Sequence, residues 1–451
     1  MYSKFVKLVI FPFIWRGTGF KILKHLNELE KSQWLTPGEI KRLQWEKLQK
    51  IIKHAYLQTH YYKQKFDEIG LHPEDIKTPE DILKIPILTK KDIKNNLTNL
   101  IAWNYADKLI KSATGGSTGE PTIFYQTRFY KDYSYAVTVR NNRWCGIDIG
   151  MKFASIWGSD FDISLTNSLK AKIYDYILNQ RIIPGFNLIS ETMHKYNQYL
   201  ERFKPITIEG YTSLLYLFAK FLMENKIYKI RPKSVISSAE TLYDYQRRLI
   251  EKAFECKVFN RYGGREMGCI AHECSQGSMH INAESVYVEV IKGNKTVPSG
   301  ETGSIVLTSL TNYGMPFIRY EIGDLGVPSN EICSCGRGLP LLKEVIGRVH
   351  DIIVTKSGKF LPGEFFPHLF KDFEGIIKFR VIQKSKEYLQ ILIVKDENFK
   401  LEYLEKMSIE IKKTVGEEVK CSFEFVDNLT PGASGKFRYT ISEIPINFRE
   451  S

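Results

Sequence analysis

The ten residues Ser112-Ala113-Thr114-Gly115-Gly116-Ser117-Thr118-Gly119-Glu120-Pro121 are the most informative stretch of this chain, and apolar sequence follows them. Glycines let backbone N–H groups approach an anion, and Ser and Thr hydroxyls add neutral donors, so the stretch suits a polyphosphate. It is not a Walker A loop, because no Gly-Lys-Ser/Thr ends it, and Gly-x-Gly-x-x-Gly is absent. Composition alone also fits a solvated linker, so the rest of the chain must decide.

Length and composition indicate an ordinary folded protein of more than one domain. The chain has 451 residues, 43% of them hydrophobic and 25% charged, which exceeds the size of one compact core. Its net charge of +13 suits nucleic acid, anionic lipid or an anionic substrate. Because the basic residues are spread along the chain and no nucleic-acid signature is present, we expect no nucleic-acid partner.

The cysteines and the N-terminus bear on where the protein works. Seven cysteines are an odd and sparse set, which predicts a reducing compartment, the cytoplasm, and metal binding rather than disulfides. Residues 5–15 are apolar but too short to span a bilayer. We expect them to pack onto the main domain. The alternative is contact with the inner face of the membrane, with Phe11, Phe13 and Trp15 in the interface and Lys4, Lys7 and Arg16 near headgroups.

Hydrophobic periodicity predicts an α/β fold with a large N-terminal domain and a small C-terminal α+β domain. Residues 38–69 read as helical, and helices start near Pro79 and Thr89. Between 112 and 325, strands alternate with helices, which predicts mainly parallel sheets covered by helices; the strands are 152–157, 206–210, 234–238 and 257–260, and the helices 213–225 and 243–254. A β-β-α-β unit follows at 376–383, 388–394, 401–414 and 421–426. We therefore expect domains at 1–346 and 347–451.

Four more segments carry residues suited to chemistry. They are Arg261-Tyr262-Gly263-Gly264-Arg265-Glu266-Met267-Gly268, Met315-Pro316-Phe317-Ile318-Arg319-Tyr320-Glu321-Ile322-Gly323-Asp324, Gly347-Arg348-Val349-His350-Asp351 and Gly432-Ala433-Ser434-Gly435-Lys436-Phe437-Arg438. The first puts an aromatic ring and a carboxylate at a strand end, where parallel sheets bind ligands and where a carboxylate suits Mg²⁺. The second ends on an aspartate that can accept two hydroxyl hydrogen bonds. Each alone is also an ordinary turn or exposed loop.

In their order, these motifs resemble those of the adenylate-forming enzymes. The most similar branch is that of the phenylacetate–CoA ligases, with its CapK-like and coenzyme F390 synthetase members. The segments Tyr61-Tyr62 and Pro86-Ile87-Leu88-Thr89-Lys90 also resemble that branch, and the likeness runs from about residue 35 onward. It implies that the small domain rotates between half-reactions about a hinge at Arg348, His350 and Asp351.

The resemblance also implies a role for each matched residue. The phosphates of ATP would bind Ser112, Thr114, Gly115, Gly116, Ser117, Thr118 and Gly119. The nucleoside would bind Ser238, Ala239, Glu240, Arg261, Tyr262, Gly263, Gly264, Asp324 and Arg348, with Tyr262 on adenine and Asp324 on ribose. Glu266 would hold Mg²⁺, and Lys436 would reach the reacting carboxylate and α-phosphate. The acyl pocket would be lined by Trp157, Tyr211, Ser213 and Ser237.

Four departures from the family pattern are present, one of them Lys359-Phe360 after Gly358, where a basic pair is more usual. Glu120 replaces the lysine often found in the phosphate loop, and His350 lies where an aspartate is usual at the hinge. Arg265 stands where many relatives carry a threonine, and it could supply the missing positive charge.

Cysteine and histidine spacing suggests a structural Zn²⁺ site. Cys269, His272, Cys274 and His280 lie close together in sequence, and Cys333-x-Cys335 follows. The family match selects the four ligands Cys274, His280, Cys333 and Cys335. The alternative is a group of buried free cysteines with a histidine.

The function expected from these motifs is carboxylate activation. ATP and a small carboxylic acid would give an acyl-adenylate and pyrophosphate, and CoA or an amine or hydroxyl acceptor, as in capsular polysaccharide assembly, would then take the acyl group. One alternative moves AMP onto a cofactor hydroxyl, as coenzyme F390 synthetases do. Another is a catalytically silent nucleotide-binding assembly protein. The sequence leaves a homodimer open.

Overall fold

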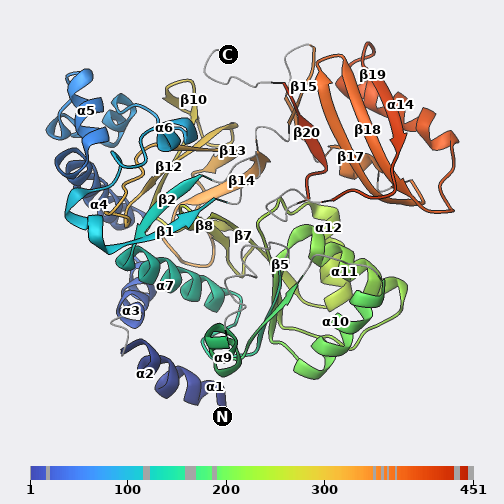
Figure 1. Ribbon diagram of the computed structural model, residues 1–451, viewed down its shortest axis with the longest axis horizontal. Coiled ribbons are helices and arrows are strands. Elements are labelled where there is room, and N and C mark those ends of the chain that lie inside the picture. The colour runs from blue at the N-terminus through green and yellow to red at the C-terminus, as the bar shows by residue number, and fades with distance from the viewer. Residues whose placement is uncertain are drawn as a thin grey trace.

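A 12-stranded sheet forms the frame of the larger part of the protein (Figure 1). It belongs to a computed structural model that describes residues 2–16, 21–114, 122–157, 169–184, 190–348, 352–356, 360–362, 365–370, 373–430 and 437–444. Among these residues the strand order is β11-β10-β12-β13-β14-β9-β8-β7-β6-β5-β3-β4.

One half of this sheet is parallel. Its strands are β3 (Phe153–Trp157), β4 (Gln180–Pro184), β5 (Thr207–Tyr211), β6 (Ser234–Ser238) and β7 (Lys257–Gly264). The helices between them are α9 (Leu169–Ile177), α10 (Ser190–Phe203), α11 (Thr212–Glu224) and α12 (Asp244–Phe254). Every residue of β5 and β6 is buried, because a parallel strand is covered on both faces. The α/β class is thereby confirmed.

The other half is antiparallel, which the alternation of strands and helices did not predict. Its strands are β8 (Gly268–Glu273), β9 (Met279–Ile281), β10 (Val286–Lys292), β11 (Lys295–Thr296), β12 (Gly303–Ser309), β13 (Tyr320–Ser329) and β14 (Leu341–Arg348). These strands follow one another through turns and loops with no helix among the described residues. Short connections of this kind join antiparallel neighbours, whereas a parallel pair needs a longer crossover.

Helices from the first third of the chain flank the antiparallel half (Figure 1). They are α3 (Ile22–Ser32), α4 (Pro37–Gln58), α5 (His60–Glu68), α6 (Lys90–Asn95) and α7 (Arg128–Trp144), with short 3-10 turns at Pro73–Asp75, Pro79–Lys84 and Trp103–Lys108. The helix expected over 38–69 is two helices. Thr59 is extended (φ −130°, ψ 142°), and its side chain caps α5 by accepting from the Tyr62 N–H.

Two of these segments support the stretch that ends at Asp324. The Tyr62 hydroxyl donates to the Pro316 carbonyl over 3.1 Å and accepts from the Ile318 N–H over 2.9 Å. The Leu88 N–H donates to the Arg319 carbonyl over 2.9 Å. The segments that resemble the ligase branch therefore brace one wall of the predicted site.

A hairpin carries the loop with which the sequence analysis began. Strand β1 (Leu109–Ala113) pairs antiparallel with β2 (Ile123–Thr127), with Ser112 opposite Phe124. The Thr122 N–H donates to the Thr114 hydroxyl over 3.0 Å and closes the base of the loop.

A second, four-stranded sheet with its own core follows the first (Figure 1). Its order is β19-β18-β17-β20, from β17 (Ile376–Ser385), β18 (Tyr388–Lys395), β19 (Lys420–Phe425) and β20 (Thr440–Ser442). Helices α13 (Phe365–Phe370) and α14 (Glu402–Val415) pack against it through Phe366, Phe370, Met407 and Ile411, and β15 (Ile352–Val354) pairs with β16 (Phe360–Pro362) nearby. The predicted β-β-α-β elements all form, within about two residues of their expected bounds.

Candidate functional site

The carboxyl ends of the parallel strands bring several predicted residues into one row. In register, Tyr211 on β5 lies beside Ser238 on β6, and Ser238 lies beside Arg261 on β7. The Trp157 ring at the end of β3 meets the Tyr211 ring edge to face, with 4.7 Å between centroids. Ligands of parallel α/β sheets bind at this edge, so the row occupies the expected place for a substrate.

Two of the predicted site residues, Arg261 and Ser237, form polar contacts with other side chains of the protein. The Arg261 guanidinium pairs with Glu209 and donates to Asn142 Oδ1 over 2.7 Å. The Ser237 hydroxyl lies 2.7 Å from the Thr212 hydroxyl. These two side chains therefore support the carboxyl-end edge of the sheet from within the protein.

Strands β7 and β13 bring the predicted adenine and ribose residues together. The Tyr262 hydroxyl donates to Asp324 Oδ2 over 2.8 Å, although 62 positions separate them. Asp324 is 9% exposed and lies opposite Arg348 in the β13–β14 register. Gly347, next to Arg348, has φ +117°, and a Cβ there would lie 2.9 Å from Thr241 Oγ1. The chain therefore needs glycine to leave β14 close to the segment 238–241.

The predicted magnesium ligand lies on the turn that follows β7. Glu266 is 9% exposed, and its carboxylate accepts from the Tyr320 hydroxyl over 3.2 Å. Its backbone carbonyl accepts from the Tyr130 hydroxyl over 2.9 Å. A Cβ on Gly263 would lie 2.4 Å from the Gly268 carbonyl oxygen, so the turn closes only with glycine there. A carboxylate held in this way is a suitable protein ligand for Mg²⁺, which keeps several waters.

Two cations lie at the base of the β1–β2 hairpin. Arg265 donates to the Ala113 carbonyl over 3.4 Å, and its own carbonyl accepts from Gln126 Nε2 over 2.9 Å. Lys131 on α7 lies near it, and burial together with the positive charge of Arg265 lowers the pKa of Lys131. The predicted residues Gly115, Gly116, Ser117, Thr118 and Gly119 lie outside the described residues.

Glu240 connects the two sheets. Its carboxylate accepts from the Ser213 N–H over 2.7 Å, from the Ser213 hydroxyl over 3.1 Å and from the Phe437 N–H over 3.0 Å. Phe437 follows Lys436 in the sequence, whereas Lys436, His350 and Asp351 themselves lie outside the described residues, as does the side chain of Arg348. Next to Glu240, Ala239 has φ +72°, an uncommon value for a residue with a side chain.

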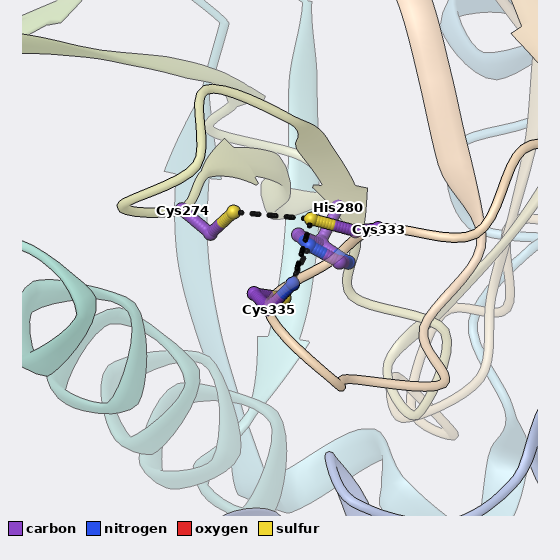
Figure 2. A group of neighbouring side chains, drawn as sticks. All are labelled: Cys274, His280, Cys333 and Cys335. Atoms are coloured by element: carbon purple, nitrogen blue, oxygen red, sulfur yellow. Dashed lines mark hydrogen bonds between the residues drawn. The ribbon is translucent and has the colours of Figure 1, made fainter.

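The four predicted zinc ligands form one cluster (Figure 2). One ligand atom from each of Cys274, His280, Cys333 and Cys335 lies within 4.8 Å of the others. The Cys274 and Cys333 sulfurs are 3.6 Å apart, and Cys335 Sγ is 3.3 Å from His280 Nε2. Tetrahedral Zn²⁺ with bonds near 2.3 Å would hold sulfurs roughly 3.8 Å apart, and a disulfide would need about 2.05 Å. The cluster therefore fits Zn²⁺.

The surroundings of this cluster also suit a metal. His280 Nδ1 lies 3.3 Å from the Leu339 carbonyl, which orients the ring with Nε2 toward the sulfurs. Burial lowers the pKa of His280 to about 4, so the imidazole is neutral. Burial raises the pKa of Cys274 to about 11, whereas for Cys333 hydrogen bonds from Ser278 and Cys335 outweigh burial and lower the pKa. Cys269 and His272, the neighbours in sequence, do not join the cluster, since His272 Nδ1 lies 2.8 Å from the Glu273 carbonyl.

Sequence reasoning missed Lys131 and Tyr320. Lys131 lies in the first turn of the helix that directly follows β2, and this nearness to the hairpin is the signal that could have found it. Tyr320 stands within the quoted segment that ends at Asp324. Its hydroxyl could be assigned to Glu266 only once β7 and β13 were seen together.

Comparisons with known proteins show similarity to CapK and to phenylacetate-coenzyme A ligases. The family model for the CapK C-terminal domain matches residues 353–443. The protein CapK of Staphylococcus aureus is 26% identical over 414 residues, which are 90% of each chain. The phenylacetate-coenzyme A ligase of Thermus thermophilus is 24% identical over 334 residues, covering 72% of this chain and 74% of the relative.

A solved structure shares the fold. 2-Hydroxyisobutyryl-CoA ligase in the postadenylation state, in complex with 2-HIB-AMP, has a TM-score of 0.75 at 20% identity and covers 92% of both chains. The same ligase in the thioesterification state, with 2-HIB-AMP and CoA, has a TM-score of 0.62 and covers 91% of both.

Proposed function

We propose that this chain, a homologue of CapK and the phenylacetate-coenzyme A ligases with the fold of acyl-CoA ligases, is an adenylate-forming ligase that uses ATP to activate a carboxylic acid. One observation carries the proposal: Tyr262 and Asp324 are hydrogen-bonded beside the carboxyl ends of β5, β6 and β7, and the Glu266 carboxylate is held by Tyr320 on the turn that follows β7. An aromatic face, a diol acceptor and a metal-binding carboxylate are what a nucleoside triphosphate requires. Tyr262 and Glu266 belong to one segment, and the fold brings Asp324 to Tyr262 from 62 positions farther along the chain.

In this proposal the site residues divide the nucleotide between them. Tyr262 stacks on adenine, while Asp324 accepts the ribose hydroxyls and Arg348 lies across from it. The hairpin loop from Ser112 to Gly119 donates to the phosphates, with Arg265 and Lys131 at its base supplying positive charge. Glu266 holds Mg²⁺, which when bound neutralises phosphate charge.

The chemical step follows from position and charge. A carboxylate oxygen of the acid attacks the α-phosphorus of ATP, the bond to the β-phosphate oxygen breaks, and acyl-adenylate and pyrophosphate form. Trp157 and Tyr211 orient the acid, with Ser213 and the buried Ser237 supporting this edge of the sheet, since an in-line approach supplies much of the acceleration. Lys436 offsets the charge that builds between carboxylate and α-phosphate.

We propose a second half-reaction on a rearranged lid. Residues 347–451 form a mobile domain that turns about Arg348, His350 and Asp351, withdrawing Lys436. An acceptor then attacks the acyl carbonyl and releases AMP. The acceptor is CoA, as the names of the ligase relatives suggest, or an amine or hydroxyl in surface polysaccharide synthesis, as the CapK relationship suggests.

Zinc has a structural role in this proposal. Cys274 and His280 follow Glu266 in the chain, and Cys333 and Cys335 follow Asp324. A Zn²⁺ ion held by all four would tie these two loops together. A closed four-ligand site of this kind leaves no open position for substrate.

The protein's setting is also part of the proposal. All seven cysteines are free thiols, which supports work in the reducing cytoplasm. No helix among the described residues is long and apolar enough to cross a membrane. The N-terminal helices are the part of the chain that would contact the inner face of the membrane. Light scattering would measure whether the protein forms a homodimer.

A panel of carboxylic acids tests the function. With ATP and Mg²⁺, we expect one class of acid to drive exchange of pyrophosphate into ATP, and Lys436→Ala to abolish it. Lys413→Ala, an exposed lysine on α14, is the matched control and keeps the activity. AMP transfer to a hydroxyl without any acid would favour the coenzyme F390 synthetase alternative. ATP binding with no pyrophosphate release across the panel would favour a silent binding protein.

A further inference from the structure

The first helices of the chain expose a stripe of large apolar side chains. Residues 2–16 form one helical run, α1 (Tyr2–Phe5), a π-helical turn (Val6–Ile10) and α2 (Phe11–Arg16). Phe5 is 51% exposed, Leu8 69%, Val9 50% and Phe13 80%. Positions three or four apart share a helix face, so these side chains make one stripe.

The opposite side of the same run is firmly packed. Val6 and Phe11 are both fully buried, and a Cβ on Gly150 would lie 2.7 Å from the Val6 Cβ. Lys7 pairs with Asp148 over 2.6 Å. For Phe11 the alternative of membrane contact is therefore wrong, because Phe11 belongs to the core beside Tyr135. The stripe is held outward by a helix that is itself fixed to the domain.

Helix α9 widens this surface. The Tyr2 hydroxyl donates to the Ile177 carbonyl over 3.0 Å, so α1 lies against α9, as Figure 1 shows at the bottom of the molecule. On α9, Ile173 is 51% exposed and Tyr176 is 69% exposed. The N-terminal surface, defined as Phe5, Leu8, Val9, Phe13, Ile173 and Tyr176, combines residues far apart in sequence. An apolar surface built from two elements is unusual on a monomer with no partner.

The positive charge of the N-terminal segment indicates what kind of partner covers the N-terminal surface. Before Glu28 the sequence contains Lys4, Lys7, Arg16, Lys21 and Lys24 and no acidic residue, and of these Lys7 pairs with Asp148 and Lys24 lies 3.9 Å from Glu28. A second copy would bring the same cations face to face, which opposes self-association. An anionic bilayer instead satisfies both features, since interfacial helices bury an apolar face and place cations near the headgroups.

We propose that the N-terminal surface lies on an anionic lipid membrane, with the helical run in the plane of the interface. The C-terminal sheet lies at the other end of the molecule in Figure 1, so the surface can be occupied while the lid changes position. This inference goes beyond the proposed chemistry and does not depend on it.

Vesicle sedimentation of the full chain tests the proposal. We expect the protein to pellet with vesicles of phosphatidylcholine and phosphatidylglycerol, to pellet less with phosphatidylcholine alone, and to be released by salt. The variant Leu8→Glu/Phe13→Glu should bind the mixed vesicles at least about tenfold more weakly, because two apolar contacts are lost and two negative charges gained. Leu401→Glu/Ile409→Glu carries the same charge change at exposed apolar positions, 69% and 46% exposed, on the far domain and should bind normally.

Light scattering tests the other possible occupant of the N-terminal surface, a second copy of the chain. Equal binding of both variants, or no binding of the unaltered protein to anionic vesicles, overturns the proposal. A dimer that becomes a monomer in Leu8→Glu/Phe13→Glu, without vesicle binding, would make the surface an interface between copies and also overturn it. Circular dichroism of both variants checks that the fold is kept.

Discussion

Replacing Glu240 with glutamine tests whether residues 347–451 act as a lid over the proposed nucleotide site. The Glu240 carboxylate is the group that joins the start of α11 to the chain following Lys436, through Ser213 and Phe437. We expect Glu240→Gln to slow formation of the acyl-adenylate, which needs Lys436 in place. Transfer of the acyl group from a preformed adenylate should change little, because in the proposed function that step uses a different lid position.

The magnitude follows from the hydrogen bonds. Glutamine offers one oxygen and one NH2 group, so its NH2 must face either the Ser213 N–H or the Phe437 N–H, and both are donors. One charge-assisted bond is therefore lost, worth about 1.5–3 kcal/mol when buried. Glu240 is only half-buried, which reduces the loss to about 1–2 kcal/mol, or about 5- to 30-fold in the closing equilibrium.

The assay measures the two half-reactions separately. Acid-dependent pyrophosphate exchange reports the first, and acyl transfer from the isolated adenylate reports the second. Glu251→Gln is the matched control, since the Glu251 carboxylate accepts a backbone N–H from Val258 over 3.0 Å away from the predicted site. Unchanged exchange in Glu240→Gln, or an equal fall in both half-reactions, would refute this account of the contact.

Three further predictions concern the β1–β2 hairpin, the zinc cluster and His54. Arg265→Ala should raise the KM for ATP about tenfold in pyrophosphate exchange, with a smaller rise in Lys131→Ala, because both cations lie at the base of the hairpin that we propose binds the phosphates; an unchanged KM would contradict this. Cys333→Ser should lose about one zinc per chain by metal analysis and lower the Tm, whereas Cys256→Ser, outside the cluster, should keep both. Burial lowers the pKa of His54, so just below pH 6.5 this histidine is protonated in the unfolded chain but stays neutral in the folded protein. The free energy of unfolding should therefore fall as the pH is lowered below 6.5. The urea midpoint of His54→Gln should fall less over the same pH range.

The elements of the fold were largely predictable, because local pattern determines them. Strands β5 and β6 are short runs with every residue buried, and β17, β18, α14 and β19 appear at almost the expected positions. The antiparallel half of the large sheet was not predictable from alternation. Its strands are joined by turns, and which strand lies beside which depends on pairing between distant segments, as for β14 and β9.

The predicted site shows the same difference between features that local sequence determines and features that depend on distant contacts. The zinc ligands could be selected by the family match, and the structure brings those four together while leaving Cys269 and His272 aside. Tyr262 and Asp324 could be nominated as separate motifs, but their direct hydrogen bond could not. The role of Glu240 toward Phe437 had no local signal, because it spans 197 positions and two sheets.

The charge at the phosphate hairpin follows from combining sequence and structure. In the proposed function the stretch from Ser112 to Gly119 binds the phosphates of ATP, and the negative charge of the neighbouring Glu120 would by itself weaken that binding. Arg265 and Lys131 oppose it from the base of the hairpin, where burial already disfavours the charged form of Lys131. A bound triphosphate would restore that charge, since nearby anions raise a lysine pKa. ATP and these two cations should therefore stabilise each other, so Glu120→Lys should tighten ATP binding less in the unaltered protein than in Arg265→Ala. Equal tightening in both backgrounds would mean that Arg265 and the loop act on different parts of the nucleotide.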